Sequence, residues 1–293
     1  MISRNSPCWC GSKKKWKHCH YPNESIPSFA TIASKYLKQY QIRLKSDKEL
    51  IGIRKACKLA SSILEKLCAM ADIGITTKAL DLYARELHKE AKAIPAPLGY
   101  GSPPFPCSIC TSLNSVICHG IPNDIPLQNG DILNIDVTSI VDGFYGDCSA
   151  MVCIGPVSRD KQLVVDTSYE ALMNSIACLQ PGKFLSEIGN TIEATAKKRG
   201  CSVVYQFVGH GIGIQFHEPP QIPHYANDIK IPLAPGMVFT IEPMINAGAA
   251  EGVIDPIDRW TARTVDGSPS AQWEHTILIT ESGYEILTKI KFA

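Results

Sequence analysis

The 293-residue chain lacks three features that would assign it to a class at once. No uninterrupted apolar run reaches the roughly 18 residues that a bilayer-spanning helix needs, which argues against a membrane protein. Residues 1–8 contain no apolar stretch of the kind found in a secretory signal, so we expect a cytoplasmic protein. The net charge is only +1, so the molecule as a whole gives no case for nucleic-acid binding.

The charge is nevertheless unevenly distributed. Residues 1–45 carry nine lysines or arginines and a single acid, Glu24, whereas residues 46–293 carry 20 basic and 27 acidic residues. A basic head on an acidic body is typical of contact with an anionic partner, although it also fits a solvated tail. Since disulfides are rare in the cytoplasm, we expect the 12 cysteines to be reduced or bound to metal.

Three of these cysteines lie close together near the amino terminus. Residues 8–12 read Cys-Trp-Cys-Gly-Ser, and residues 18–20 read His-Cys-His after a basic stretch. So short a segment cannot bury a core, whereas three thiolates and one imidazole can hold a tetrahedral zinc ion. The segment resembles the SEC-C zinc motif. That resemblance implies one structural zinc bound, in a small domain over residues 1–22, by Cys8, Cys10, Cys19 and His20.

His18 is a competing candidate for the fourth zinc ligand. Residues 23–45 contain Pro27 and show no clear helical period, so we interpret them as a linker or as an arm that wraps the main domain. The main, catalytic domain is predicted to cover residues 46–293.

Five residues of this main domain are candidate ligands for a pair of metal ions. Four of them are acids, and these lie within strand-like apolar runs. The five are Asp136, Asp147, His210, Glu242 and Glu274. An isolated ionised carboxylate is very costly to bury, so buried charges are usually paired or bound to metal. The four carboxylates carry four negative charges and the neutral imidazole carries none, so two divalent cations would balance the charge of the cluster. This balance indicates a two-metal site and therefore an enzyme.

The surrounding sequence predicts two helices followed by strands. Ser46 and Glu49 form a capping box at the start of the first helix. Its inward stripe is Ile53, Cys57, Ala60, Leu64 and Leu67, and that of a second helix, starting at Thr76 or Thr77, is Leu80, Ala84, Leu87 and Ala91. Residues 141–144 predict a hairpin turn that could bring Asp136 and Asp147 together. After Pro156 the order of two helices and acid-bearing strands recurs, which hints at an internal duplication.

Six short sequences make this domain similar to a type I methionine aminopeptidase. They are Cys-His-Gly-Ile-Pro (118–122), Gly-Asp-Ile-Leu-Asn-Ile-Asp-Val (130–137), Gly-His-Gly-Ile-Gly (209–213), Phe-His-Glu-Pro-Pro (216–220), Thr-Ile-Glu-Pro-Met (240–244) and Glu-His-Thr-Ile (274–277). The resemblance runs from about residue 46 to the end of the chain. It implies an α+β pita-bread fold, in which two pseudo-symmetric halves share a central antiparallel sheet that is flanked by helices. It also implies that the protein is a monomer.

The same resemblance implies that the chain removes the N-terminal methionine from nascent proteins whose second residue is small. The candidate ligands match those of the family, in which Asp147 and Glu274 bridge two ions, Asp136 completes one side, and His210 with Glu242 completes the other. The ions can be Mn(II), Fe(II), Co(II) or Zn(II). Water activated by the two ions attacks the first peptide bond.

Further roles follow from the family pattern. Glu242 takes and passes a proton, His119 contacts the scissile amide nitrogen, and His217 hydrogen-bonds the substrate carbonyl and stabilises the oxyanion. The methionine side chain needs an apolar pocket, for which sulfur–aromatic contacts are favourable. The family's pocket positions fall on Tyr100, Phe105, Cys110, Phe216 and Trp260. The loop that carries the first two is about two residues longer than the common pattern.

Two other functions stay open on the sequence alone. A proline-specific peptidase of the same fold shares the five ligands, although such enzymes usually carry a full additional N-terminal domain. A catalytically inactive module of this fold would bind protein or RNA through its basic zinc head. An active peptidase could also dock through that head to the ribosome, where nascent chains emerge, or to another anionic partner.

Overall fold

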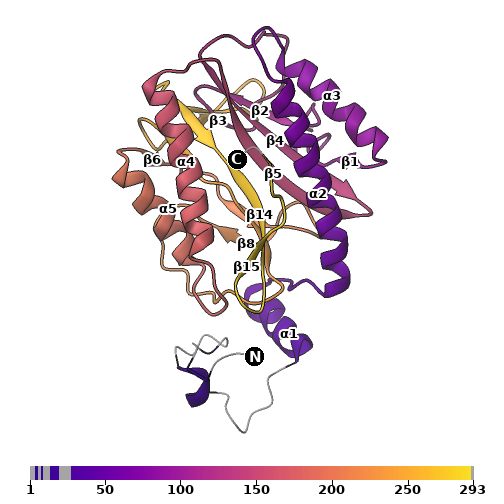
Figure 1. The fold of residues 1–293 in the computed structure, drawn as a ribbon, viewed down its shortest axis with the longest axis vertical. Coiled ribbons are helices and arrows are strands. Elements are labelled where there is room, and N and C mark those ends of the chain that lie inside the picture. Colours follow the sequence, from indigo (N-terminus) through magenta and orange to yellow (C-terminus); the bar gives the residue numbers. More distant parts are fainter. Residues whose placement is uncertain (1–3, 6–7, 9–13, 20–27, 292–293) are drawn as a thin grey trace.

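In the described part of the chain a run of helices is followed by a run of strands, and this order then recurs (Figure 1). The computed structural model describes residues 4–5, 8, 14–19 and 28–291. The helices are η1 (Trp16–His18, a 3-10 turn), α1 (Phe29–Tyr40), α2 (Asp47–Met70), α3 (Thr77–Glu90), α4 (Arg159–Ala177) and α5 (Ser186–Lys198). None of these described helices has the length and apolar character to cross a bilayer.

The strands are short except for one hairpin of two long strands. They are β1 (Ile94–Pro95), β2 (Cys110–Leu113), β3 (Val116–Cys118), β4 (Asp131–Val141), β5 (Phe144–Ile154), β6 (Ser202–Val203), β7 (Gly209–Gly211), β8 (Glu218–Ile222), β9 (Val238–Ile241), β10 (Met244–Asn246), β11 (Gly252–Ile254), β12 (Ala262–Thr264), β13 (Ser270–Gln272), β14 (Glu274–Ile279) and β15 (Tyr284–Ile286).

Within the described residues these strands form one large sheet and two small ones. The large sheet has the order β1-β4-β5-β14-β9-β7-β8, with β2 beside β4 and β15 beside β14. The small sheets are β13-β10-β6 and β11-β12-β3. Figure 1 shows α2 and α3 over the half of the sheet that holds β4 and β5, and α4 and α5 over the other half. This arrangement confirms the predicted α+β pita-bread fold.

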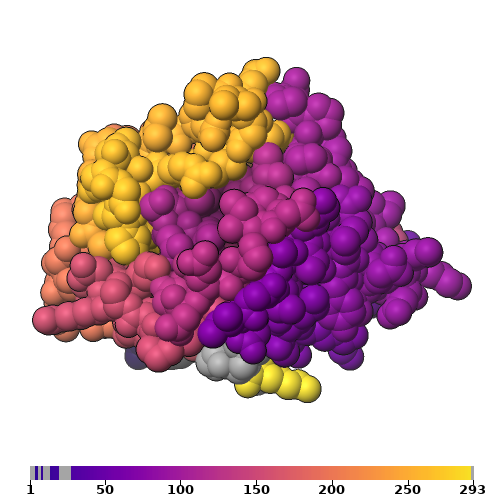
Figure 2. Space-filling view, turned by 90° about the horizontal axis from the view of Figure 1, so that it is seen from above, coloured from indigo at the N-terminus to yellow at the C-terminus, as the bar shows by residue number. Residues whose placement is uncertain are grey.

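The C-terminal quarter of the chain returns to the first half. Strand β14 pairs with β5, and β12 pairs with β3. Figure 2 shows the gold surface of the C-terminal quarter beside the purple and magenta surface of the first half. The two halves are therefore joined by backbone pairing and not by side-chain contact alone.

Helix α2 starts and packs as the sequence predicts. The Ser46 side chain accepts a hydrogen bond from the Glu49 amide, and the Glu49 carboxylate accepts one from the Ser46 amide at 2.8 Å. All five residues of the predicted apolar stripe are buried. In α3 the first three predicted inward residues are buried, but the prediction for Ala91 is wrong, because the helix ends at Glu90 and Ala91 is its exposed C-cap.

The β4–β5 hairpin fixes the first two candidate ligands. Its turn residues Asp142 and Gly143 have φ angles of 52° and 82°, the left-handed pair that suits a tight two-residue hairpin. In the resulting register Asp136 lies opposite Ser149, and Thr138 lies opposite Asp147. Asp136 and Asp147 are therefore diagonal neighbours on one face of the sheet, as the sequence predicts.

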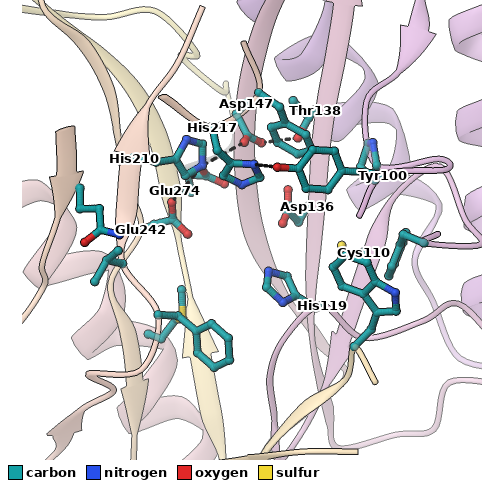
Figure 3. Close-up of a pocket in the computed structure, with 18 of the residues that line it drawn as sticks. Tyr100, Cys110, His119, Asp136, Thr138, Asp147, His210, His217, Glu242 and Glu274 are labelled. Carbon is teal, nitrogen blue, oxygen red and sulfur yellow. Dashed lines mark hydrogen bonds and ion pairs between the residues drawn. The ribbon is translucent and has the colours of Figure 1, made fainter. Parts of the chain in front are cut away.

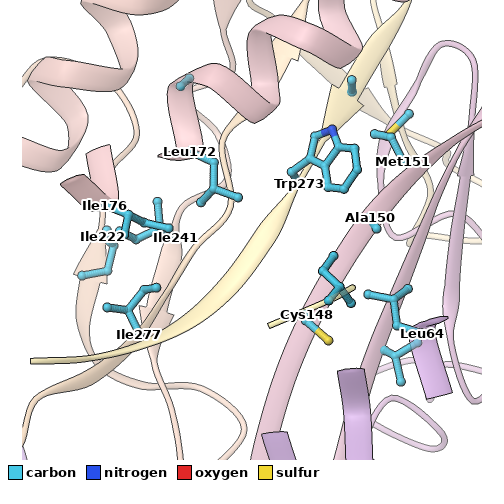
Figure 4. Packing of buried hydrophobic residues seen from close by; sticks show 14 of the residues in the cluster. Leu64, Cys148, Ala150, Met151, Leu172, Ile176, Ile222, Ile241, Trp273 and Ile277 are labelled. Atoms are coloured by element: carbon cyan, nitrogen blue, oxygen red, sulfur yellow. The ribbon is translucent and has the colours of Figure 1, made fainter. Parts of the chain in front are cut away.

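The hydrophobic core lies between the sheet and the helices. Figure 4 shows Ile176 of α4 beside Ile222 and Ile241 of the sheet, and Leu64 of α2 near Cys148 of β5. Full burial of such an aliphatic side chain stabilises a fold by about 1.5–3 kcal/mol. The core thus anchors the sheet that carries the candidate ligands.

Residues 29–40 form helix α1, so the expectation that residues 23–45 lack a helical period is wrong. Ile32, Tyr36 and Tyr40 recur at helical spacing and pack on the main core. Ser28 caps this helix by accepting a hydrogen bond from the Thr31 amide. The Tyr36 ring is buried, and its hydroxyl donates to the Pro232 carbonyl at 2.8 Å. Ile42 and Leu44, which follow the helix, are buried in the main core. The segment from Ser28 to residue 45 therefore packs on the body.

Lys45 ends this segment as a buried cation. Its side chain is 1% exposed, and its ammonium lies 2.7 Å from the carboxylate of Glu218, which is 8% exposed. The ammonium also donates to the Arg43 carbonyl at 3.0 Å. Burial lowers the pKa of Lys45, and the attraction of Glu218 opposes that effect. This ion pair ties the end of the segment to the start of β8, next to His217.

We predict that Lys45→Met destabilises the fold by about 3–5 kcal/mol, because it leaves the buried Glu218 carboxylate without its partner. The double variant Lys45→Met/Glu218→Gln should regain a large part of that loss. Urea denaturation measures both. Lys55→Met is the matched control: Lys55 pairs with Asp142 at 3.7 Å on the surface, and its loss should change little. Equal effects of the two single substitutions would contradict the assigned role of Lys45.

Candidate metal centre

Strand pairing in the large sheet brings Asp136 and Asp147 of the first half close to Glu274 of β14. Ser149 of β5 pairs on one side with Asp136 of β4 and on the other with Glu274 of β14. Paired residues of an antiparallel sheet project from the same face. Asp147, two residues before Ser149, projects from that face as well. Three of the candidate ligands thus stand on three neighbouring strands.

The second half brings the other two ligands to the same place. Thr240 of β9 pairs with Thr276 of β14, so Glu242, just after the end of β9, lies next to Glu274. The amide of His210 in β7 donates to the Thr240 hydroxyl at 3.0 Å, which places His210 beside this acid. All five side chains line one cavity of about 670 Å³, as Figure 3 shows.

The ligand atoms lie at distances that metal ions can bridge. One ligand atom from each of Asp147, His210 and Glu274 lies within 4.8 Å of the others. His210 Nε2 is 3.8 Å from Asp147 Oδ2 and 3.6 Å from Glu242 Oε1. Asp136 lies close enough to Asp147 for the two carboxyl groups to affect each other's pKa. The five side chains therefore form one connected cluster.

Two threonines fix the orientation of this cluster. The Thr138 hydroxyl donates to Asp147 Oδ1 at 2.7 Å, and the Thr240 hydroxyl donates to Glu242 Oε1 at 2.6 Å. Neither threonine was predicted from the sequence. Each lies two positions from a candidate acid on a strand, so the two-residue period of a strand was a signal that could have found them.

Two more residues hold Glu242 from distant segments. Gln272 Nε2 donates to Glu242 Oε2 at 3.0 Å, and His224 Nε2 accepts the Glu242 amide hydrogen at 3.2 Å. His224 is fully buried. Neither residue has a local sequence signal, because both contacts depend on how strands far apart in the chain are packed.

The electrostatics of the cluster indicate a site for cations. Burial raises the pKa of all four carboxyl groups, and repulsion by neighbouring acids adds to the effect for Asp147, Glu242 and Glu274. Burial also lowers the pKa of His210 to about 3, so that this imidazole is neutral near pH 7 and free to act as a ligand. Among the described residues no lysine or arginine pairs with the four acids. An oxygen-rich donor set with one imidazole and no balancing side-chain cation fits divalent metal ions.

The seven residues predicted to bind substrate line the same cavity. They are Tyr100, Phe105, Cys110, His119, Phe216, His217 and Trp260. The rings of Phe105 and Trp260 meet edge to face at 5.3 Å, and His119 lies 6.0 Å from Trp260. Burial raises the pKa of the Cys110 thiol well above its usual value, so the sulfur stays protonated and apolar. Pro97, Phe207 and Met244 add to this apolar wall.

The candidate zinc ligands lie only partly within the described residues. Cys8 is buried, and its amide donates to the Lys14 carbonyl at 2.8 Å. The turn η1 follows and leads to Cys19, whereas the side chain of His18 is exposed. Cys10 and His20 lie outside the described residues.

Comparison with known families and proteins agrees with this geometry. The pattern of metallopeptidase family M24 matches residues 52–281, and that of the SEC-C motif matches residues 4–22. A methionine aminopeptidase of Chlamydia trachomatis is 61% identical over 287 residues, which are 98% of this chain and 99% of that protein. One of Rickettsia prowazekii is 45% identical over 84% of this chain and 95% of that protein.

Solved structures give the same result. The crystal structure of the methionine aminopeptidase from Rickettsia prowazekii has a TM-score of 0.82 at 44% identity, and the match covers 85% of this chain and 100% of that chain. The prolidase from Pyrococcus furiosus shares the fold, with a TM-score of 0.67 at 21% identity over 89% of this chain and 68% of that chain. The chain therefore belongs to metallopeptidase family M24, on the branch of the methionine aminopeptidases.

Proposed function

We propose that this protein removes the N-terminal methionine from peptides and nascent proteins whose second residue is small. One observation supports this most strongly. A single cavity of about 670 Å³ joins the acid–histidine cluster to an apolar wall of aromatic rings and a protonated thiol. A hydrolytic centre beside a pocket suited to a thioether is what the release of methionine requires.

The five-residue cluster would hold two divalent cations, drawn from Mn(II), Fe(II), Co(II) and Zn(II). Such cations supply Lewis acidity, which withdraws charge from a carbonyl oxygen and lowers the pKa of water. The ligands are Asp136, Asp147, His210, Glu242 and Glu274. Their four negative charges on ionisation match the charge of two such ions.

Side chains around the cluster would handle the proton and the developing charge. Glu242, held through both oxygens by Thr240 and Gln272, would accept a proton from the attacking water and pass it on. His217 would donate a hydrogen bond to the carbonyl oxygen of the scissile bond, and His119 would contact the amide nitrogen. Burial lowers the pKa of His119 and of His217 to about 4, so both rings are neutral near pH 7.

The methionine side chain would lie against the aromatic wall. Phe105 and Trp260 form one side of it, and Phe216 and Tyr100, whose rings are 4.9 Å apart, form the other. Cys110 would contribute an apolar sulfur. A proline-specific peptidase would not need this wall, which is why we favour the methionine enzyme.

We predict that, with added Mn(II) or Co(II), the protein releases methionine from Met-Ala-Ser but not from Met-Leu-Ser or from an Ala-Pro peptide. Asp136→Asn should lower the rate at least about a hundredfold, because it removes a ligand charge. Mass spectrometry of the products measures this. Cleavage before proline would move the function to the prolidase branch. No cleavage of any peptide with any metal would instead favour a binding module.

We further propose that the amino-terminal head binds one structural zinc through Cys8, Cys10, Cys19 and His20 and docks to the ribosome in the cytoplasm. The described part of the head presents exposed Lys14 and Lys15 around its turn. Attraction between such lysines and ribosomal RNA would be strongest at low salt.

We predict that Lys14→Glu/Lys15→Glu weakens co-sedimentation with ribosomes at low salt and leaves the turnover of small peptides unchanged. The control Lys35→Glu/Lys38→Glu makes the same change of charge at exposed positions of α1. Equal co-sedimentation of the two variants would rule out docking through the head.

A further inference from the structure

A loop held tightly over the cavity carries Tyr100. Gly101 lies directly on the indole of Trp260, where an added Cβ would come within 2.5 Å of the ring. Two residues on, the Pro103 carbonyl accepts a hydrogen bond from Trp260 Nε1 at 3.0 Å. Gly101 also has a φ of 75°, a conformation that favours glycine. The loop is thus fixed on Trp260 immediately after Tyr100.

Tyr100 reaches from this loop to His217. Its hydroxyl lies 2.7 Å from His217 Nδ1, as the dashed line in Figure 3 shows. Its ring contacts His217 at 5.1 Å and Phe216 at 4.9 Å between ring centres. The hydrogen bond therefore joins the loop that carries Tyr100 to the segment between β7 and β8, although Tyr100 and His217 are 117 residues apart in the sequence.

The direction of this hydrogen bond is linked to the position of the His217 ring proton. A neutral imidazole has one nitrogen that donates and one that accepts. The distance fits either direction, and we assign the Tyr100 hydroxyl as the donor to Nδ1 because a phenol donates more strongly than it accepts. The proton of the ring must then be on Nε2, because the hydrogen bond made by one ring nitrogen determines the state of the other.

We propose that Tyr100 is a positioning residue whose hydroxyl fixes the tautomer and the orientation of the His217 ring, so that Nε2–H is presented to the substrate carbonyl. This inference rests on the proposed aminopeptidase function. It gives Tyr100 a second role beside its place in the methionine pocket. The residue that contacts the methionine side chain also orients the group that contacts the carbonyl oxygen.

The direct test is ¹⁵N NMR of histidine-labelled, metal-free protein, with His217 assigned through His217→Gln. We expect His217 to be in the Nε2–H tautomer in the unmodified protein and in a mixture of tautomers in Tyr100→Phe. Tyr145→Phe is the matched control. Tyr145 stacks on Phe216 at 6.1 Å, but the hydrogen bond to His217 comes from Tyr100. A proton on Nδ1 in the unmodified protein, or an unchanged tautomer in Tyr100→Phe, would overturn the proposal.

Kinetics supply a second readout. Tyr100→Phe should lower kcat for Met-Ala-Ser roughly three- to tenfold, as expected for the loss of one hydrogen bond, and should leave KM within about twofold, because the aromatic ring remains. Tyr145→Phe should match the unmodified protein. An unchanged kcat in Tyr100→Phe would also overturn the proposal. If the unmodified protein releases no methionine, the proposed function fails, and the NMR result still decides the tautomer.

Discussion

Four carboxyl groups that converge on one cavity repel one another, and the structure depends on how that repulsion is balanced. Three of them, Asp147, Glu242 and Glu274, are buried, and burial raises the pKa of each. A protein would lose little by replacing such acids with apolar side chains if they served stability alone. Their retention on the central sheet makes sense if divalent cations supply the missing positive charge.

The arrangement of the sheet explains why the acids meet. The β4–β5 hairpin supplies Asp136 and Asp147, and the second half supplies His210 and Glu242. Strand β14 lies between β5 and β9 and carries Glu274, so this acid stands at the joint of the two halves. A slip of one residue in any of these pairings would turn a ligand to the opposite face of the sheet. The helices and the apolar core on that opposite face hold the register.

The sequence predicted much of the fold and the positions of the candidate ligands, because each is encoded locally. Capping at Ser46, the apolar stripe of α2 and the turn at residues 141–144 all depend on neighbours within a few positions. Helix α1 has a local signal of the same kind, since Ile32, Tyr36 and Tyr40 recur at helical spacing, and the interpretation of residues 23–45 as a linker or arm overlooked it. The contacts of Glu242 with Gln272 and His224, and the contact between Tyr100 and His217, were not predicted, because they exist only once distant segments are packed together.

The most direct test of the account is a calorimetric titration of metal-free protein with Mn(II) at pH 7. Burial raises the pKa of Asp136 to about 7 and that of Glu242 to about 8, so both groups are at least partly protonated at pH 7 before metal binds. We expect two ions per chain and a release of protons on binding, seen as a heat that depends on the ionisation enthalpy of the buffer. Binding of fewer than two ions, or binding without release of protons, would contradict the claim that this cluster is built to hold a pair of cations.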